Sequence, residues 1–196
     1  MTRKIFVLSG HLGQDRFGHA LADSYETAAK KAGADVKRMN LNEISFEHGL
    51  LAGDQKNRQD LEPDLQQFQQ YLTWCNHWTI LHPLWWGGMP GPLKSLMDRT
   101  LLPNFAFKYQ EGKAFPAKLL KGRSARVMIT SDTPGWFLNW IYGAGGNKAT
   151  KRQILDFIGF EKSKFDNFGP MQNSKPQQRE KWLQKAGALA LKDARH

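Results

Sequence analysis

The sequence has little of what marks several large classes of protein. Cys75 is its one cysteine, so the chain can form neither an internal disulfide nor a cysteine-rich metal site. We therefore expect a reducing cytoplasm and no metal. The most apolar stretch is interrupted by His82, Pro83 and Pro90, and nothing approaches the roughly 18 apolar residues of a membrane span. The apolar run at residues 5–8 is too short for the core of a signal peptide.

Acidic residues are scarce in the second half of the chain. Residues 1–103 balance 11 Lys/Arg against 11 Asp/Glu, whereas residues 104–196 carry 17 and 7, which accounts for the whole net charge of +10. A basic half can attract nucleic acid, an anionic membrane surface or a phosphorylated small ligand. The sequence has no zinc-finger spacing, RNP-type strand or basic recognition helix, so we do not expect nucleic acid binding.

Strand and helix patterns alternate along the chain. Its 196 residues favour a single domain, residues 1–196. Apolar runs predict strands at five places and apolar stripes predict the helices between them. The strands are expected at residues 5–8, 36–39, 78–81, 126–129 and 164–167. The helices are expected near 17–28 (ending before Gly33), 63–72, 93–101, 151–158 and 177–194. Residues 41–59 are polar and irregular and read as a long surface connection.

Such βα units predict an α/β fold with a parallel sheet covered by helices on both faces. Five units in this length suit a flavodoxin-like three-layer sandwich with strand order 2-1-3-4-5. Ligands of such sheets bind beyond the carboxyl ends of the strands, where the strand order reverses. The rule directs attention to three loops, at residues 9–18, 83–90 and 130–135.

The first loop delivers free backbone N–H groups and a helix N-terminus to one place, which favours an anion. It contains neither GxGxxG nor GxxxxGK[ST], so a plain βα turn is an equal alternative. His11 alone is more often a hydrogen-bonded turn residue than a ligand or a base.

The second loop holds two adjacent tryptophans, Trp85 and Trp86, between Pro83 and the pair Gly87 and Gly88. Glycines let backbone amides approach a ring edge, and tryptophans offer flat apolar surface to a planar ring. The simpler alternative is that the tryptophans pack in the core or against a second subunit.

The third loop presents hydroxyls and a carboxylate at residues 130–133, which suit the polar edge of a ring or simple turn capping. An aromatic segment at residues 136–142 follows, before a glycine-rich stretch. It can line a pocket for a flat aromatic substrate, or be buried against a second subunit; the two uses are compatible.

Three motifs together carry a family resemblance. They are Gly10-His11-x₅-Phe17, Pro83-Leu84-Trp85-Trp86-Gly87-x-Met89-Pro90-x₂-Leu93-Lys94 with Asp98-Arg99, and Phe105-Ala106-Phe107. This combination resembles the flavodoxin-like NAD(P)H:quinone oxidoreductases, DT-diaphorase and its bacterial relatives. The likeness covers most of the chain. It implies a homodimer that holds FMN or FAD near the subunit interface, accepts hydride from NAD(P)H and reduces quinones or related electrophiles.

The resemblance assigns roles residue by residue. His11 and Phe17 would flank the flavin phosphate or ribityl chain, and Thr130 with Ser131 would face the polar edge of the ring. Residues 83–87 would line the isoalloxazine, namely Pro83, Leu84, Trp85, Trp86 and Gly87. The chain departs from its relatives at Arg16, where a Ser is common, at Gly18, where an Asn is common, and at Asp132-Thr133, where Gly-Gly is common. Arg16 can offset the lost hydroxyl by pairing with phosphate, and Tyr142 is the nearest candidate for a catalytic acid.

The expected reaction is ping-pong hydride transfer in which the protein orients donor and acceptor, and backbone N–H groups of residues 85–88 tune the ring. FMN is preferred over FAD because no segment identifies itself as an adenine site. The basic half favours the anionic nicotinamide dinucleotide. Two alternatives share the fold: a one-electron carrier, which is commonly acidic, and an ancillary subunit that regulates a membrane transporter, with possible peripheral membrane contact.

Overall fold

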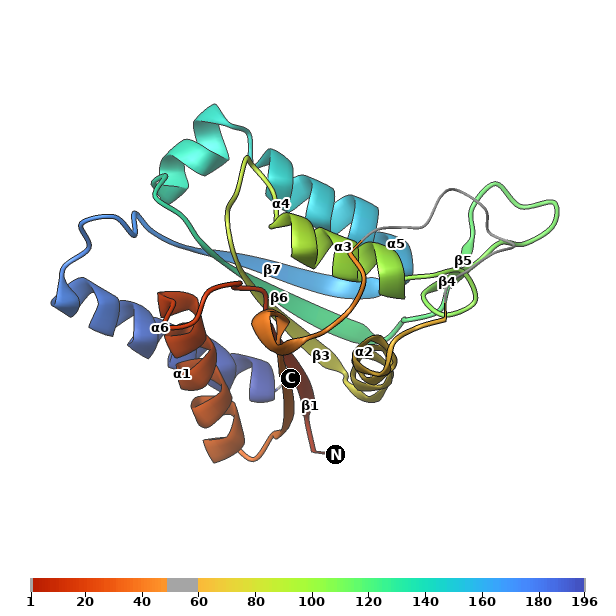
Figure 1. Cartoon of the computed structure of the whole chain (residues 1–196), viewed down its shortest axis with the longest axis horizontal. Coiled ribbons are helices and arrows are strands. Elements are labelled where there is room, and N and C mark those ends of the chain that lie inside the picture. Colours follow the sequence, from red (N-terminus) through yellow and green to blue (C-terminus); the bar gives the residue numbers. More distant parts are fainter. Residues whose placement is uncertain (1, 49–59, 196) are drawn as a thin grey trace.

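The computed structural model describes residues 2–48 and 60–195, and Figure 1 shows their arrangement. The strands are β1 (Lys4–Ser9), β2 (Asp35–Asn40), β3 (His77–Pro83), β4 (Phe107–Lys108), β5 (Ala117–Lys118), β6 (Arg123–Thr130) and β7 (Phe160–Phe168). The α-helices are α1 (Phe17–Lys31), α2 (Pro63–Trp74), α3 (Gly91–Thr100), α4 (Gly145–Ala149), α5 (Asp156–Ile158) and α6 (Pro176–Ala194). A 3₁₀ turn, η1 (Leu41–Glu43), and two π-helical segments, η2 (Phe137–Ile141) and η3 (Thr150–Leu155), complete the elements.

The main sheet has five parallel strands in the order β2-β1-β3-β6-β7. The two short strands β4 and β5 pair with each other, antiparallel, in a separate hairpin. Because β1 lies between β2 and β3, the strand order reverses at β1 and β3. The carboxyl ends of these two strands carry the first and second loops, so the fold places both loops at the reversal point.

Alternating side chains of β1 point to opposite faces of the sheet, as strand geometry requires. Phe6 and Leu8 join a core cluster with residues of α2 and α3, while Ile5 and Val7 join a second cluster with residues of α1 and α6. Trp78 is fully buried on the first face, where its ring stacks on that of Phe6. Helices therefore cover both faces of the sheet (Figure 1).

The C-terminal helix α6 is fastened to the sheet by buried charges. Arg126 of β6 donates from Nε and Nη2 to the carboxylate of Asp193, over 2.5 and 2.8 Å. Its Nη1 pairs with Asp166 of β7. Tyr25 of α1 donates its hydroxyl to the same Asp193 over 2.9 Å. Strand β6 and helix α1 thus both donate hydrogen bonds to one buried carboxylate of α6, and His77 of β3 lies 3.3 Å from it.

Several elements extend beyond their expected bounds. The last strand begins at residue 160 instead of 164, because it pairs with β6 along its whole length. The helix expected at 151–158 begins at residue 145 and includes a π-helical stretch. The β4–β5 hairpin had no sequence prediction. Of the expected connection at 41–59, residues 49–59 lie outside the described part of the chain. No helix within residues 2–48 and 60–195 is long and apolar enough to cross a membrane.

Candidate functional site

The three loops at the carboxyl edge are tied together by hydrogen bonds. The N–H of Gly10 in the first loop donates to Leu81 O over 2.6 Å, and the N–H of Leu84 in the second donates to Thr130 O over 2.8 Å. His11 Nε2 lies 3.1 Å from Thr130 Oγ1, which joins the first loop to the third. Residues 119 positions apart therefore meet at one edge.

Helix α1 begins in the first loop with an open N-terminus. Its N-cap residue, Arg16, makes no side-chain cap, and its first turn holds no acidic residue. Backbone N–H groups there are available to an anion, and the helix dipole favours negative charge. The guanidinium of Arg16 folds back over Gly13, where a Cβ would lie 2.4 Å from Arg16 Nε. A cation and a helix N-terminus therefore meet at this loop.

His11 is buried beneath the first loop, and Gly18 lies directly against its ring. A Cβ on Gly18 would lie 2.0 Å from His11 Cε1. Burial, aided by nearby His19, His82 and Arg16, lowers the pKa of His11 to about 3, so the ring is neutral. Its Nδ1 is buried and has no hydrogen-bond partner among the described residues. When Thr130 donates to Nε2, Nδ1 carries the proton and can donate to a ligand.

The second loop makes a tight turn at residues 85–88. Trp85 and Gly88 exchange N–H···O bonds of 2.9 and 3.0 Å, and the central residues Trp86 and Gly87 have φ of +49° and +79°. These are the φ signs of a type I′ turn. Trp86 is fully exposed and Trp85 half-exposed, so neither packs in the core. No acceptor within the described residues takes the N–H groups of Trp86 and Gly87. Leu84, by contrast, packs on the first core cluster.

The polar side chains of the third loop find most of their hydrogen-bond partners within the chain. Thr130 and Ser131 are buried. Ser131 Oγ donates to Thr133 O over 2.8 Å, and Asp132 Oδ1 accepts the N–H of Gln172 over 2.5 Å. The side chains of Ser131 and Asp132 are therefore used as turn caps, the alternative that the sequence left open, and a ring edge here would meet Thr130 and the loop backbone.

The aromatic segment after the third loop is turned toward solvent. Trp136, Trp140, Ile141 and Tyr142 are all exposed. The ring of Tyr142, the candidate acid, packs edge-on against Phe137 with centroids 5.0 Å apart. None of these five residues lines the cleft described next.

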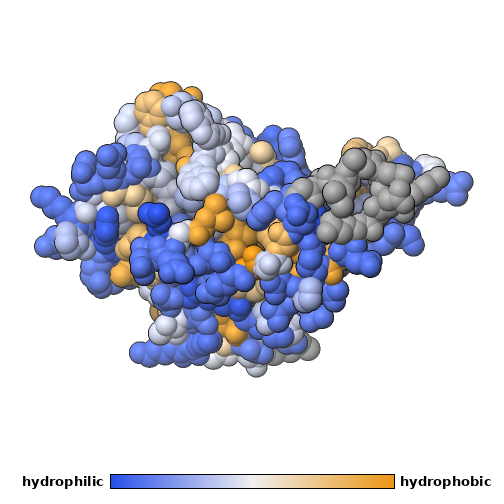
Figure 2. Space-filling view, viewed as in Figure 1, coloured by the Kyte–Doolittle hydropathy of each residue, from blue (hydrophilic) through white to orange (hydrophobic). Residues whose placement is uncertain are grey.

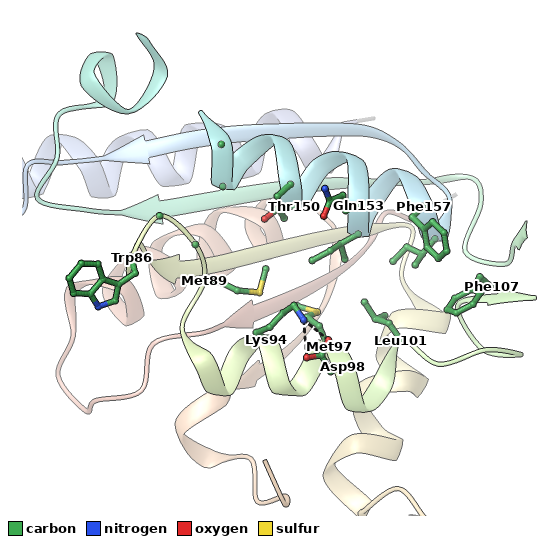
Figure 3. Close-up of a pocket in the computed structure, with 17 residues that line it drawn as sticks. Trp86, Met89, Lys94, Met97, Asp98, Leu101, Phe107, Thr150, Gln153 and Phe157 are labelled. Atoms are coloured by element: carbon green, nitrogen blue, oxygen red, sulfur yellow. Dashed lines mark hydrogen bonds and ion pairs between the residues drawn. The ribbon is translucent and has the colours of Figure 1, made fainter. Parts of the chain in front are cut away.

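A cleft of about 730 Å³ lies between the Trp86 turn, helix α3 and the helical segment 145–158. Figure 3 shows Met89, Met97, Leu101 and Phe157 along it and the ion pair of Lys94 with Asp98 at its side. Lys94 and Asp98 belong to the family motif, and Gly145 and Gly146 belong to the glycine-rich stretch. The motifs do not include the other helical residues of the cleft. Their signal in the sequence is the apolar pair Ile154 and Phe157 beside the fully buried Leu155.

The predicted cofactor residues do not share one cavity. Trp86 and Gly87 line the cleft, whereas Arg16 and Phe17 line a second hollow of about 640 Å³ with Arg179. The Arg179 guanidinium lies 5.7 Å from the centre of the Phe17 ring. The carboxyl edge thus combines an uncapped helix N-terminus with Arg16 at the first loop and exposed tryptophan rings at the second.

Comparisons with known proteins agree with this geometry. Residues 3–190 match a protein family described as having a flavodoxin-like fold. A protein of Haemophilus influenzae named an uncharacterized NAD(P)H oxidoreductase is 27% identical over 156 residues, which cover 78% of this chain and 76% of that protein. The FMN-dependent NADH:quinone oxidoreductase 2 of Listeria innocua is 29% identical over 141 residues, covering 65% and 61%.

A crystal structure of a Streptococcus mutans protein superposes with a TM-score of 0.83 at 25% identity, covering 96% of this chain and 99% of that one. The match over nearly the whole chain, together with relatives that carry oxidoreductase names, confirms the resemblance read from the three sequence motifs. The chain therefore belongs to the flavodoxin-like family that includes the NAD(P)H:quinone oxidoreductases.

Proposed function

We propose that this protein is an FMN-dependent NAD(P)H oxidoreductase that reduces quinones or related electrophiles. The observation that carries the proposal is the contact between His11 and Thr130 beside the uncapped N-terminus of α1. It joins an anion-binding loop to the edge where the Trp86 turn offers a flat surface. The names of the Haemophilus and Listeria relatives support the same activity, and they give no support to the transporter-subunit alternative.

The residues present fit the phosphate end of FMN. His11 Nδ1 is a buried nitrogen without a partner in the described chain, the first turn of α1 is uncapped, and Arg16 brings a cation. We assign the phosphate to these groups, with Phe17 and Gly18 as the flanking residues. Gly18 is needed because any larger residue there would displace the His11 ring.

The Trp86 turn fits the ring end. The free N–H groups of Trp86 and Gly87 would donate to the ring edge, and Pro83, Leu84 and Trp85 would lie along the ring. FMN bound there would supply hydride transfer in two half-reactions, first from NAD(P)H and then to the acceptor. The chain positions both substrates in turn, so most of its contribution is orientation. Tyr142 stays the candidate proton donor.

The rest of the proposal concerns the molecule as a whole. We propose that residues 1–196 form one three-layer domain, with β6 and β7 as the fourth and fifth strands of the expected order. We also propose a homodimer, which the family resemblance implies. FMN is preferred to FAD on the names of relatives. The lone cysteine, Cys75, is buried and its pKa is raised to about 12, which suits a cytoplasmic protein without a reactive thiol.

The test is the absorption spectrum of the purified protein, with the acid-released flavin identified, followed by NADPH and a quinone in the same cuvette. We expect flavin that NADPH bleaches and quinone recolours. Arg16→Gln should weaken FMN binding about tenfold, the loss of one charge-assisted contact, whereas Lys31→Gln at the far end of α1 should not. A protein that stays colourless after incubation with FMN and with FAD contradicts the proposal.

A further inference from the structure

The aromatic segment after the third loop exposes large apolar side chains of the kind usually found in a protein core. Trp136, Trp140, Ile141 and Tyr142, here called the aromatic knob, are 63%, 85%, 61% and 64% exposed. They lie on and beside η2, which projects at the top of the molecule in Figure 1. Figure 2 shows apolar side chains gathered at the same projecting end. Several large apolar side chains exposed together on one projection mark an interaction surface.

The local geometry explains why the knob faces outward. Trp136, Trp140 and Ile141 are spaced i, i+4 and i+5, which places them on one face because η2 is π-helical and its turn repeats between four and five residues. The opposite side of the turn already holds Leu138, which is buried. Phe137 braces the knob from beneath, with its ring 5.4 Å from that of Trp136 and 5.0 Å from that of Tyr142. The turn is thus anchored on one face and apolar on the other.

The segment that follows the knob carries positive charge, whereas the nearest carboxylate before it, that of Asp132, accepts the N–H of Gln172. Residues 133–155 contain Lys148, Lys151 and Arg152 and no Asp or Glu. Lys151 pairs with Asp156, whereas Lys148 and Arg152 are exposed and have no ion-pair partner in the described chain. Tryptophan and tyrosine are enriched at the water interface of bilayers, and cations next to them attract anionic lipid headgroups. A second copy of this surface would instead bring like charges together.

The knob is also joined to the rim of the candidate site. Gly146, four residues after Tyr142, lies against the Trp86 turn so closely that a Cβ on it would be 2.0 Å from Gly87 O. Gly146 and Trp86 both line the cleft. A surface that covers the knob therefore also adjoins the mouth of the cleft.

We propose that the aromatic knob docks on an anionic lipid bilayer and that the quinone reduced by this protein is a lipophilic one dissolved in that bilayer. Docking places Trp136, Trp140 and Ile141 in the headgroup region and Lys148 and Arg152 against the lipid phosphates. The quinone then enters the cleft beside Trp86 without crossing bulk water. The identity of the substrate rests on the proposed function, but the docking does not.

The test is co-sedimentation of the FMN-loaded full chain with phosphatidylcholine vesicles that contain or lack phosphatidylglycerol. We expect binding to the anionic vesicles that weakens with salt. Trp136→Ser with Trp140→Ser should lower the affinity at least about tenfold, because two apolar anchors are lost. Lys148→Gln with Arg152→Gln should lower it about 25-fold, at a factor of about five for each cation.

Matched controls lie elsewhere on the molecule. Phe115→Ser removes an equally exposed aromatic side chain from the β4–β5 hairpin, and Lys31→Gln with Lys192→Gln removes two exposed cations at the other edge of the sheet. Both should bind vesicles like the wild type. All four variants should keep wild-type turnover of a water-soluble quinone. The variants at Trp136 with Trp140 and at Lys148 with Arg152 should lose turnover of a long-chain quinone in vesicles, and the two controls should keep it.

Two results would overturn the docking. One is equal vesicle binding by the knob variants and the wild type. The other is absence of vesicle binding by the wild-type chain. If the Trp136→Ser, Trp140→Ser variant is then also a monomer where the wild type is a dimer, measured by light scattering, the knob is a subunit interface. Vesicle binding without any quinone turnover would instead refute the proposed function and leave the docking intact.

Discussion

Three buried, uncharged histidines make the stability of this protein depend on pH. Burial lowers the pKa of His11 to about 3 and of His82 to about 4, and it also lowers that of His77. Unfolded histidines titrate near pH 6.5, about the model-peptide value. Below that pH these histidines are protonated in the unfolded chain but stay neutral in the folded chain, so acid favours unfolding.

We therefore expect the free energy of unfolding to be at its full value above about pH 6.5 and to fall as the pH drops toward about 4. Each of the three histidines adds a slope of up to about 1.4 kcal/mol per pH unit. Urea unfolding of the apoprotein at a series of pH values measures this. His82→Gln should make the slope shallower, and an unchanged slope would mean that the His82 ring is not held neutral by burial.

Gly18 is the residue whose smallness the site needs most. A methyl group there would lie within 2.3 Å of three atoms of the His11 imidazole, and the ring would have to leave Thr130. We expect Gly18→Ala to weaken FMN binding about tenfold or more, because one buried hydrogen bond and the ring position are lost. Fluorescence titration with FMN measures the affinity. Gly91→Ala is the matched control, since a Cβ at Gly91 meets no atom within 4 Å; equal affinities in the two variants would contradict the role of Gly18.

At the scale of elements, the Trp85–Gly88 turn stores strain. Trp86 adopts φ +49°, which costs a non-glycine residue roughly 1–2 kcal/mol, and its ring is exposed and gains no core packing in return. Strain of this kind persists where a side chain is needed for function.

We accordingly expect Trp86→Gly to raise the free energy of unfolding of the apoprotein by about 1 kcal/mol and to lower quinone turnover. Thermal unfolding and steady-state kinetics measure the two effects. Trp86→Asn separates them further, because asparagine tolerates the left-handed conformation but lacks the ring. Unchanged quinone turnover in both variants would show that the Trp86 ring takes no part in the site.

At the scale of the whole molecule, the ion cluster of Arg126 decides how α6 is held. Asp193 is buried, and its hydrogen bonds from Arg126, together with the His77 ring 3.3 Å away, keep its pKa well below the usual range. Removing one partner leaves an unpaired charge inside the protein. We expect Arg126→Met to cost about 3–5 kcal/mol of unfolding free energy, measured by urea denaturation.

A paired change tests the cause. Arg126→Met with Asp193→Leu removes both charges and should recover a large part of the loss. If the double variant is no more stable than Arg126→Met, the unpaired charge of Asp193 is not the cause of the lost stability. The folded cluster also predicts a further loss of stability in acid below about pH 4, as the unfolded carboxylates take up protons.

The sequence alone determined the secondary elements and their alternation, because buried parallel strands read as apolar runs such as residues 5–8 and helices as periodic stripes. It also determined the three loops, since the sheet rule depends only on the order of the elements. It did not predict the β4–β5 hairpin, whose strands are two residues long, or the early start of the helical segment at Gly145. Glycines at residues 145 and 146 disfavour a helix there, and the close packing of Gly146 against the Trp86 turn outweighs that preference.

Only the tertiary structure decided how the site residues are used. Whether Ser131 and Asp132 face a ligand or cap a turn depends on Thr133 O and the N–H of Gln172, and the latter is 40 residues away. The two tryptophans are exposed because the chain makes a tight turn at residues 85–88, and the residue types alone do not predict that turn. The sequence names the groups that can act; their distances and exposure come from contacts between segments far apart in the chain.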